Sequence, residues 1–66
     1  MQVKATFTER RSDGMQKWER IELPQSDRNR YIWLAPFQSK PGLAIGAVET
    51  LEFVKRDYWA GWKITR

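Results

Sequence analysis

The stretch TLEFVKRDYWAGWKITR, residues 50–66, decides the fold because two alternating apolar segments in it can pair across a short turn. Placing Phe53 opposite Trp62 sets further apolar or oppositely charged residues against one another, as cross-strand pairs prefer. These further pairs are Leu51 with Ile64, Glu52 with Lys63, and Glu49 with Arg66. The stretch therefore predicts a β-hairpin with its turn near Asp57 and Tyr58.

The predicted turn carries the side chains that most indicate a function. Tyr58 and Trp59 lie at or beside the tip, where little else can cover them, and Lys55 and Arg56 flank the two rings. Burial in the core and exposure as a contact surface therefore remain alternatives for Tyr58 and Trp59.

The segment before this hairpin, residues 43–54, is compatible with two structures. Its apolar spacing fits one face of a strand and also one face of a helix. Gly46 disfavours a helix interior by about 1 kcal/mol relative to Ala, and several β-branched residues favour a strand. We therefore predict a strand bent at Gly46, with a helix of one or two turns over residues 43–49 as the alternative.

In residues 30–37, RYIWLAPF, apolar side chains occur at both odd and even positions. This pattern is typical of a strand covered on both faces. Pro36 marks the end of this strand or an edge position. Tyr31 and Trp33 are interpreted as core residues, as is Trp62 in the hairpin. Polar, turn-forming residues on either side predict surface loops.

A second hairpin is predicted at the start of the chain, where residues 2–9 alternate between apolar and polar side chains. A three-residue loop, Ser12-Asp13-Gly14, with Gly14 in the left-handed conformation sets Glu9 against Lys17. It also sets Phe7 against Glu19, an unfavourable pair that a β-bulge could repair. The remaining predicted pairs are Val3 with Leu23, Ala5 with Ile21, and Lys4 with Glu22.

This register places Trp18 beside Thr8, on the face opposite the apolar residues. The ring is then either exposed or covered by a second layer. A homodimer is one arrangement that would cover it.

The elements sum to about five short strands in a single mostly β domain, residues 1–66. We predict a curled antiparallel sheet or a small barrel, and an α+β arrangement is the alternative if residues 43–49 are helical. The expected core consists of Val3, Ala5, Phe7, Ile21, Leu23, Ile32, Leu34, Leu51, Phe53, Trp62 and Ile64.

The composition excludes the commonest catalytic and metal sites. The 66 residues contain neither His nor Cys, so an imidazole base, a thiolate nucleophile and the usual zinc ligands are missing. We therefore predict a non-catalytic protein without a metal or cofactor. The sequence shows no signal peptide and no run of roughly 20 apolar residues, which predicts a cytoplasmic protein without membrane contact.

The charge balance mildly favours an anionic partner, since twelve Lys and Arg against eight Asp and Glu give a net charge of +4. Proteins hold nucleic acids by stacking bases on aromatic rings and placing cations against phosphates. Our hypothesis is a small nucleic-acid-binding protein with a basic, aromatic hairpin surface. The predicted contact residues are Arg28, Arg30, Lys55, Arg56, Tyr58 and Trp59.

The same residue types are enriched in protein interfaces. The alternative hypothesis is a small inhibitor or adaptor protein, of the kind carried by phages and mobile elements, that occludes the surface of a host or other partner protein. Ionic strength distinguishes the two, because phosphate contacts weaken steeply with salt and an aromatic protein interface responds far less.

Overall fold

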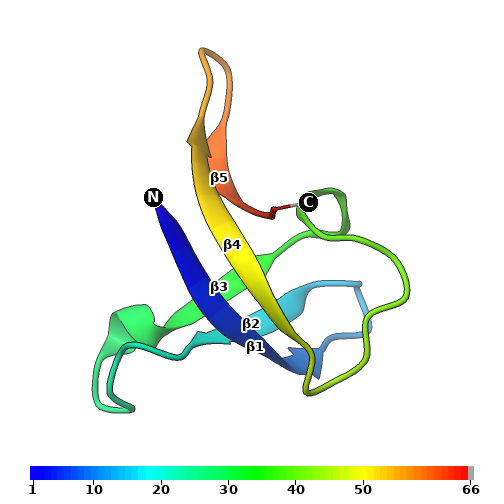
Figure 1. Cartoon of the computed structure of the whole chain (residues 1–66). Coiled ribbons are helices and arrows are strands. Elements are labelled where there is room, and N and C mark those ends of the chain that lie inside the picture. Colours follow the sequence, from blue (N-terminus) through cyan, green and yellow to red (C-terminus); the bar gives the residue numbers. More distant parts are fainter. Residues whose placement is uncertain (66) are drawn as a thin grey trace.

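The computed structural model describes residues 1–65 and consists of five β-strands with two short 3₁₀ helices (Figure 1). The strands are β1 (Gln2–Arg10), β2 (Gln16–Arg20), β3 (Tyr31–Leu34), β4 (Val48–Lys55) and β5 (Ala60–Ile64), and the helices are η1 (Arg28–Arg30) and η2 (Pro36–Gln38). All strand pairs are antiparallel. The prediction of a mostly β fold is confirmed, and no α-helix occurs within residues 1–65.

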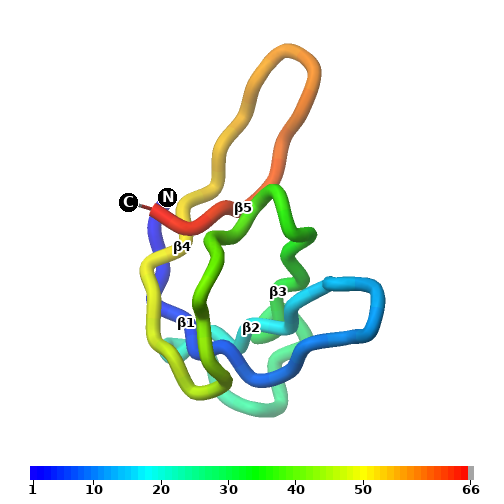
Figure 2. Tube along the Cα trace, turned by 90° about the vertical axis from the view of Figure 1, so that its right-hand side faces the viewer, coloured from blue at the N-terminus to red at the C-terminus, as the bar shows by residue number. Residues whose placement is uncertain are grey.

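The sheet follows the order β3-β2-β1-β4-β5. Strands β1 to β3 are consecutive neighbours, and β4 returns through the long connection 35–47 to lie on the other side of β1, which is a Greek-key arrangement. The sheet curls so strongly that its two edge strands, β3 and β5, come into contact and the whole forms a half-barrel (Figures 1 and 2).

The side chain of Gln38 bridges the seam between these two edges. Its Oε1 accepts a hydrogen bond from the backbone N–H of Ala35, directly after β3, at 2.8 Å. Its Nε2 donates to the carbonyl of Trp62 on β5, also at 2.8 Å. One amide side chain thus satisfies backbone groups on both sides of the seam, which no strand ladder joins.

The core lies inside the curl and is centred on a stacked pair of rings. Phe7 on β1 and Trp18 on β2 are both fully buried, with ring centroids 5.2 Å apart and planes at 17°. Burying each ring removes roughly 150–250 Å² from water, worth about 4–6 kcal/mol before the entropy of folding is counted. The buried cluster is completed by Val3, Ala5, Ile32, Leu34, Leu51 and Ile64.

One buried polar side chain supports this core. Gln16 is almost inaccessible, and its Oε1 accepts hydrogen bonds from the indole N–H of Trp18 at 3.1 Å and from the hydroxyl of Ser39 at 2.7 Å. The only polar atom of the Trp18 side chain is therefore satisfied without water.

The first hairpin has the predicted three-residue loop. Residues Arg11 and Met15 close it through a backbone hydrogen bond of 2.9 Å, Gly14 has φ +91°, and Glu9 pairs with Lys17 as predicted. A bulge then shifts the register between Phe7 and Glu9.

Beyond the bulge, the predicted pairs of the first hairpin are wrong. Phe7 lies opposite Trp18, and Ala5 lies opposite Arg20, where Ile21 was expected. The predicted pairs of Val3 with Leu23 and Lys4 with Glu22 do not form either, since β2 ends at Arg20. The shift by one residue turns Trp18 inward, so the uncovered ring that suggested a homodimer does not exist.

Several rings and aliphatic side chains expected in the core lie nearer the surface. Ile21 is 54% exposed and Phe53 is 42% exposed, and Leu23 is only partly buried. Tyr31 and Trp33 lie on the outer face of β3, because only Ile32 and Leu34 of that strand point inward. Trp62 is partly buried and packs against the core cluster.

Residues 43–47 form neither the predicted bent strand nor the alternative helix. They make turns, with Gly46 at φ +99°, and β4 begins only at Val48. The backbone of Phe7 anchors this segment, since its N–H donates to Ala47 at 2.8 Å and its carbonyl accepts from Gly46 at 2.8 Å. Gly46 thus marks a turn before the strand.

The second hairpin has the predicted register. Leu51 pairs with Ile64, Glu52 with Lys63, and Phe53 with Trp62. Glu49 forms an ion pair with Lys40 at 3.1 Å, while its predicted partner Arg66 lies outside the described residues. In the part of the chain that the structure describes, no helix has the length and apolar character required to cross a membrane.

Candidate functional site

The β4–β5 hairpin projects from the half-barrel as an arm (Figure 2). Pairing between β4 and β1 ends at Glu52 with Gln2, so the part of the hairpin beyond it has no neighbouring strand. Lys55 and Ala60 form the last pair, and Arg56 N–H donates to the Trp59 carbonyl at 2.7 Å. We call the four residues Arg56–Trp59 the tip.

Trp59 folds back from the tip onto the body of the arm. The space above Gly61 is filled by its ring, since a Cβ atom at position 61 would lie 2.8 Å from Trp59 Cζ2. Phe37 of η2 meets the same ring edge-on, with the centroids 5.8 Å apart. Trp59 is therefore half-buried, and the absence of a side chain at Gly61 is what permits its position.

A cleft of about 440 Å³ opens between this arm and η2. Two strongly exposed rings border the cleft: Tyr58 is 90% exposed and Phe37 is 74% exposed. Among residues 1–65 the lining consists of Phe37, Gln38, Val54, Arg56, Tyr58, Trp59 and Lys63.

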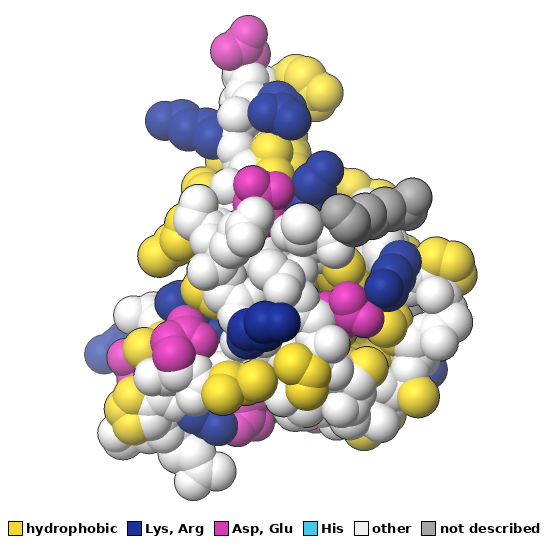
Figure 3. Space-filling view, viewed as in Figure 1, with side chains coloured by type: hydrophobic (Ala, Val, Ile, Leu, Met, Phe, Trp, Pro, Cys, Tyr) yellow, Lys and Arg dark blue, Asp and Glu magenta, His cyan; other side chains and the backbone are white. Residues whose placement is uncertain are grey.

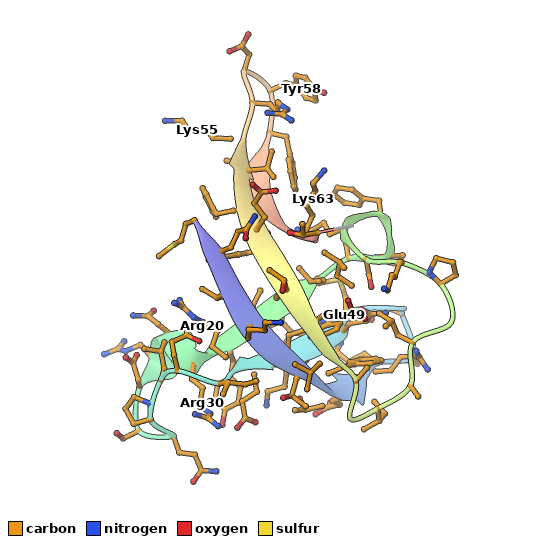
Figure 4. The ribbon with its side chains drawn as sticks, in the orientation of Figure 1. Arg20, Arg30, Glu49, Lys55, Tyr58 and Lys63 are labelled. Atoms are coloured by element: carbon orange, nitrogen blue, oxygen red, sulfur yellow. The ribbon has the colours of Figure 1, made fainter. Side chains whose placement is uncertain are left out.

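The cations of the arm divide between its two sides. Figure 4 shows Tyr58 and Lys63 on one side of the hairpin and Lys55 pointing to the other side. The alternation of side chains along β4 explains why Lys55 points away from the cleft, since its strand neighbour Val54 lines it. Neither Arg56 nor Lys63 forms an ion pair within residues 1–65. Of the predicted site, the cleft thus contains Arg56, Tyr58 and Trp59 and not Lys55.

The surface around the arm carries charges of both signs. Figure 3 shows basic and hydrophobic side chains around the projecting hairpin together with acidic side chains at its apex and on its flank, and acidic and basic side chains are interleaved elsewhere on this face. Away from the arm, this face therefore presents no extended region of purely positive or purely negative charge.

Arg28 and Arg30, which were predicted to belong to the same site, lie at the opposite end of the molecule, in η1 (Figures 1 and 4). Arg30 is largely buried against its neighbours, because its Nε donates to Glu19 Oε1 at 2.7 Å and its guanidinium also donates to the Leu23 carbonyl. Arg28 is exposed. The structure thus separates the two predicted basic clusters.

A second ion pair, beside Arg30, neutralises more of the positive charge at this end of the molecule. Arg20 contacts Glu22 at 2.6 Å. Desolvation acts to raise the pKa of Glu22, but hydrogen bonds from its own backbone and from Arg20 and the positive charges of Arg20 and Arg30 outweigh it, so the pKa lies below its ordinary value. These arginines are engaged with carboxylates in the folded chain.

Comparison with protein-family models, with curated proteins and with solved structures gives no match to this chain. Within residues 1–65, no group of three or more His, Cys, Asp or Glu side chains is arranged to hold a metal ion. The geometry of the cleft is therefore the basis for a functional proposal.

The predicted site lacked four members of the cleft: Val54 and Lys63 on the arm, and Phe37 and Gln38 opposite it. Phe37 and Gln38 both belong to η2, in the long connection between β3 and β4, and the expected end of a strand at Pro36 gave no reason to place them beside the tip. Lys63 was predicted only as the cross-strand partner of Glu52. A signal did exist for Phe37, since a large apolar residue directly after a proline in a loop has little to bury it.

Proposed function

We propose that this protein binds nucleic acid without catalysis and that the contact surface is the cleft between the arm and η2. In this proposal a base stacks against Tyr58, with Phe37 bordering the same space. Arg56 and Lys63 meet the phosphates on either side.

The observation that carries the proposal is the exposure of Tyr58 beside Arg56 and Lys63, two cations that form no ion pair within residues 1–65. An aromatic ring that could bury roughly 150–250 Å² is left 90% in water, which folding alone does not favour. The exposed rings on the strands already have partners: Lys17 Nζ lies 4.4 Å from the ring centroid of Tyr31, the Arg11 guanidinium lies 5.4 Å from that of Trp33, and Phe53 meets Trp62 edge-on with the centroids 5.4 Å apart. Tyr58 makes no such contact within residues 1–65.

The architecture adds support of a weaker kind. Among partly open, five-stranded Greek-key barrels are oligonucleotide-binding proteins that use the loop between the fourth and fifth strands, and the tip occupies that place in this chain. Because a fold alone does not determine function, the proposal rests mainly on the aromatic rings and cations of the cleft.

The direct test is binding of labelled single-stranded DNA, RNA and duplex DNA, measured by fluorescence anisotropy over a range of salt concentrations. If Arg56 and Lys63 each neutralise one phosphate of a single strand, the logarithm of the affinity falls against the logarithm of salt with a slope of about −1.4. A failure of all three nucleic acids to bind at low salt would refute the proposal.

Variants of the cleft locate the contact. Tyr58→Ala is expected to weaken affinity by about 5- to 150-fold, because a stacked base contributes about 1–3 kcal/mol, whereas Tyr58→Phe retains the stacking surface. Lys63→Ala should lower both the affinity and the salt slope, while Lys4→Ala, an exposed strand lysine outside the cleft, should change neither. Equal losses for Lys63→Ala and Lys4→Ala would show that the cleft is not the site.

A further inference from the structure

The cleft presents the faces of aromatic rings, and a base inside a duplex cannot stack against them. Bases inside a duplex are covered above and below by their neighbours and present only their edges in the grooves. A base must therefore be unpaired and unstacked before Tyr58 can lie against its face. At about 440 Å³ the cleft is also of the size of sites for small molecules.

The polar groups of the cleft are poorly placed to read a base edge. Among residues 1–65 the cleft has one amide side chain, that of Gln38, and its orientation is fixed by one hydrogen bond at each end, Oε1 with the Ala35 N–H and Nε2 with the Trp62 carbonyl, which leaves one N–H and one lone pair free. The floor is formed by the buried aliphatic side chain of Val54. The main remaining groups are the exposed Tyr58 ring, which can stack on any base, and the charges of Arg56 and Lys63, which can contact the phosphates beside it.

We infer that the cleft accepts one unpaired base of any identity, so that the protein selects single strands over duplexes and tolerates different sequences. This inference rests on the proposed function and specifies its ligand class. Stacking supplies the preference for an unpaired strand, and the two backbone hydrogen bonds of Gln38 take up half of the donor and acceptor capacity with which its amide could discriminate between bases.

The test compares labelled strands of about 12 nucleotides, within the roughly 4–16 nucleotides of single-strand sites. The strands are oligo-dT, oligo-dA, an abasic strand with the same number of phosphates, and a duplex of equal length. The abasic strand is the key control, because it preserves every charge and removes every stacking face.

For the wild-type chain we expect the single strands to bind about 10-fold or more tighter than both the duplex and the abasic strand, with oligo-dT and oligo-dA within about 5-fold of each other. Tyr58→Ala should reduce the affinity for oligo-dT to that for the abasic strand, and Tyr58→Phe should not. Amide NMR spectra of both variants establish that they fold.

The outcomes separate the two proposals. Equal binding of oligo-dT, the abasic strand and the duplex overturns this inference and leaves nucleic-acid binding through charge intact. A preference for one base well beyond 5-fold overturns the sequence tolerance. Loss of binding to every one of these nucleic acids overturns the proposed function itself.

Discussion

Gly61 shapes the candidate site through the side chain that it lacks. The ring of Trp59 lies where a Cβ atom would be, and Phe37 then meets that ring from η2. The glycine thus controls the shape of the cleft through the position of the Trp59 ring, although in the proposal it contacts no ligand itself. Its role could not be predicted from the sequence, because a glycine within a strand also signals a bulge or a bend.

Gly61→Ala should therefore displace the indole of Trp59 without unfolding the protein. A Cβ at 2.8 Å forces the ring to move, and since the ring is at the surface the destabilisation should stay at or below the roughly 1–3 kcal/mol of an overpacked core. In NMR spectra the Trp59 indole N–H signal should shift and that of Trp18 should not. In a Trp59→Ala background the destabilisation should fall to the smaller part that comes from Gln38 Nε2, 3.2 Å from the added Cβ, and a destabilisation of unchanged size would contradict this account.

Gln16 is the residue on which the buried indole depends. Gln16→Leu leaves the Trp18 N–H without an acceptor, so we expect the free energy of unfolding to fall by about 1–3 kcal/mol in urea titrations. Ser39→Ala removes only a donor to Gln16, and the Trp18 bond survives, so its effect should be about 1 kcal/mol or less. A larger effect at Ser39 than at Gln16 would contradict the assigned roles.

At the scale of elements, the two hairpins show what sequence patterns can and cannot predict. In the β4–β5 hairpin a single register satisfies both the apolar and the charged pairs, and the structure has that register. In the β1–β2 hairpin the loop and the pair of Glu9 with Lys17 were predicted, and the unfavourable pair of Phe7 with Glu19 indicated a bulge near Phe7, whereas the pairs beyond the bulge were predicted wrongly. Stacking Phe7 on Trp18 in the core required the shift, and this gain depends on tertiary packing.

The arm should be separable from the rest of the fold. Replacing the tip, Arg56–Trp59, with Asn-Gly connects Lys55 and Ala60 by a two-residue turn suited to a hairpin. We expect the free energy of unfolding to fall by only about 1–2 kcal/mol, for the lost contacts of Trp59, and oligonucleotide binding to be lost.

Urea unfolding and anisotropy titrations of the same preparation check both parts of this expectation. A replacement by four Gly and Ser residues keeps the loop length and should lose binding equally. Undiminished binding by either variant would remove the tip from the contact surface.

At the scale of the whole molecule, the long connection 35–47 determines both the closure of the half-barrel and the second wall of the cleft. Pro36 indicates where β3 ends, yet no local pattern shows that η2 then turns towards β5. Phe37 and Gln38 reach the arm only because the sheet curls, and curl depends on bulges, twist and packing throughout the chain. For this reason the sequence indicated the tip as a contact surface but did not show that Phe37 and Gln38 of η2 lie opposite it.

Gln38 should control how tightly the seam is held. Gln38→Ala removes both bridging hydrogen bonds, so we expect a destabilisation of about 1–2 kcal/mol and faster amide exchange at Ala35. Gln38→Glu keeps an acceptor for the Ala35 N–H and removes the donor to Trp62, so the amide of Ala35 should stay protected. Exchange at Ala35 that is unchanged in Gln38→Ala would show that the bridge does not restrain the seam.

The contact between β3 and β5 has a consequence for behaviour at high concentration. A flat sheet of this size would present two rows of unpaired backbone groups, each a template for a strand from another molecule and hence for fibril growth. In this chain the two edges approach each other where β3 and β5 come into contact, and the amide of Gln38 occupies part of the gap. The curl that assembles the cleft therefore makes part of both edges less accessible to a strand from another molecule, and the edge of β4 beyond Glu52 stays open.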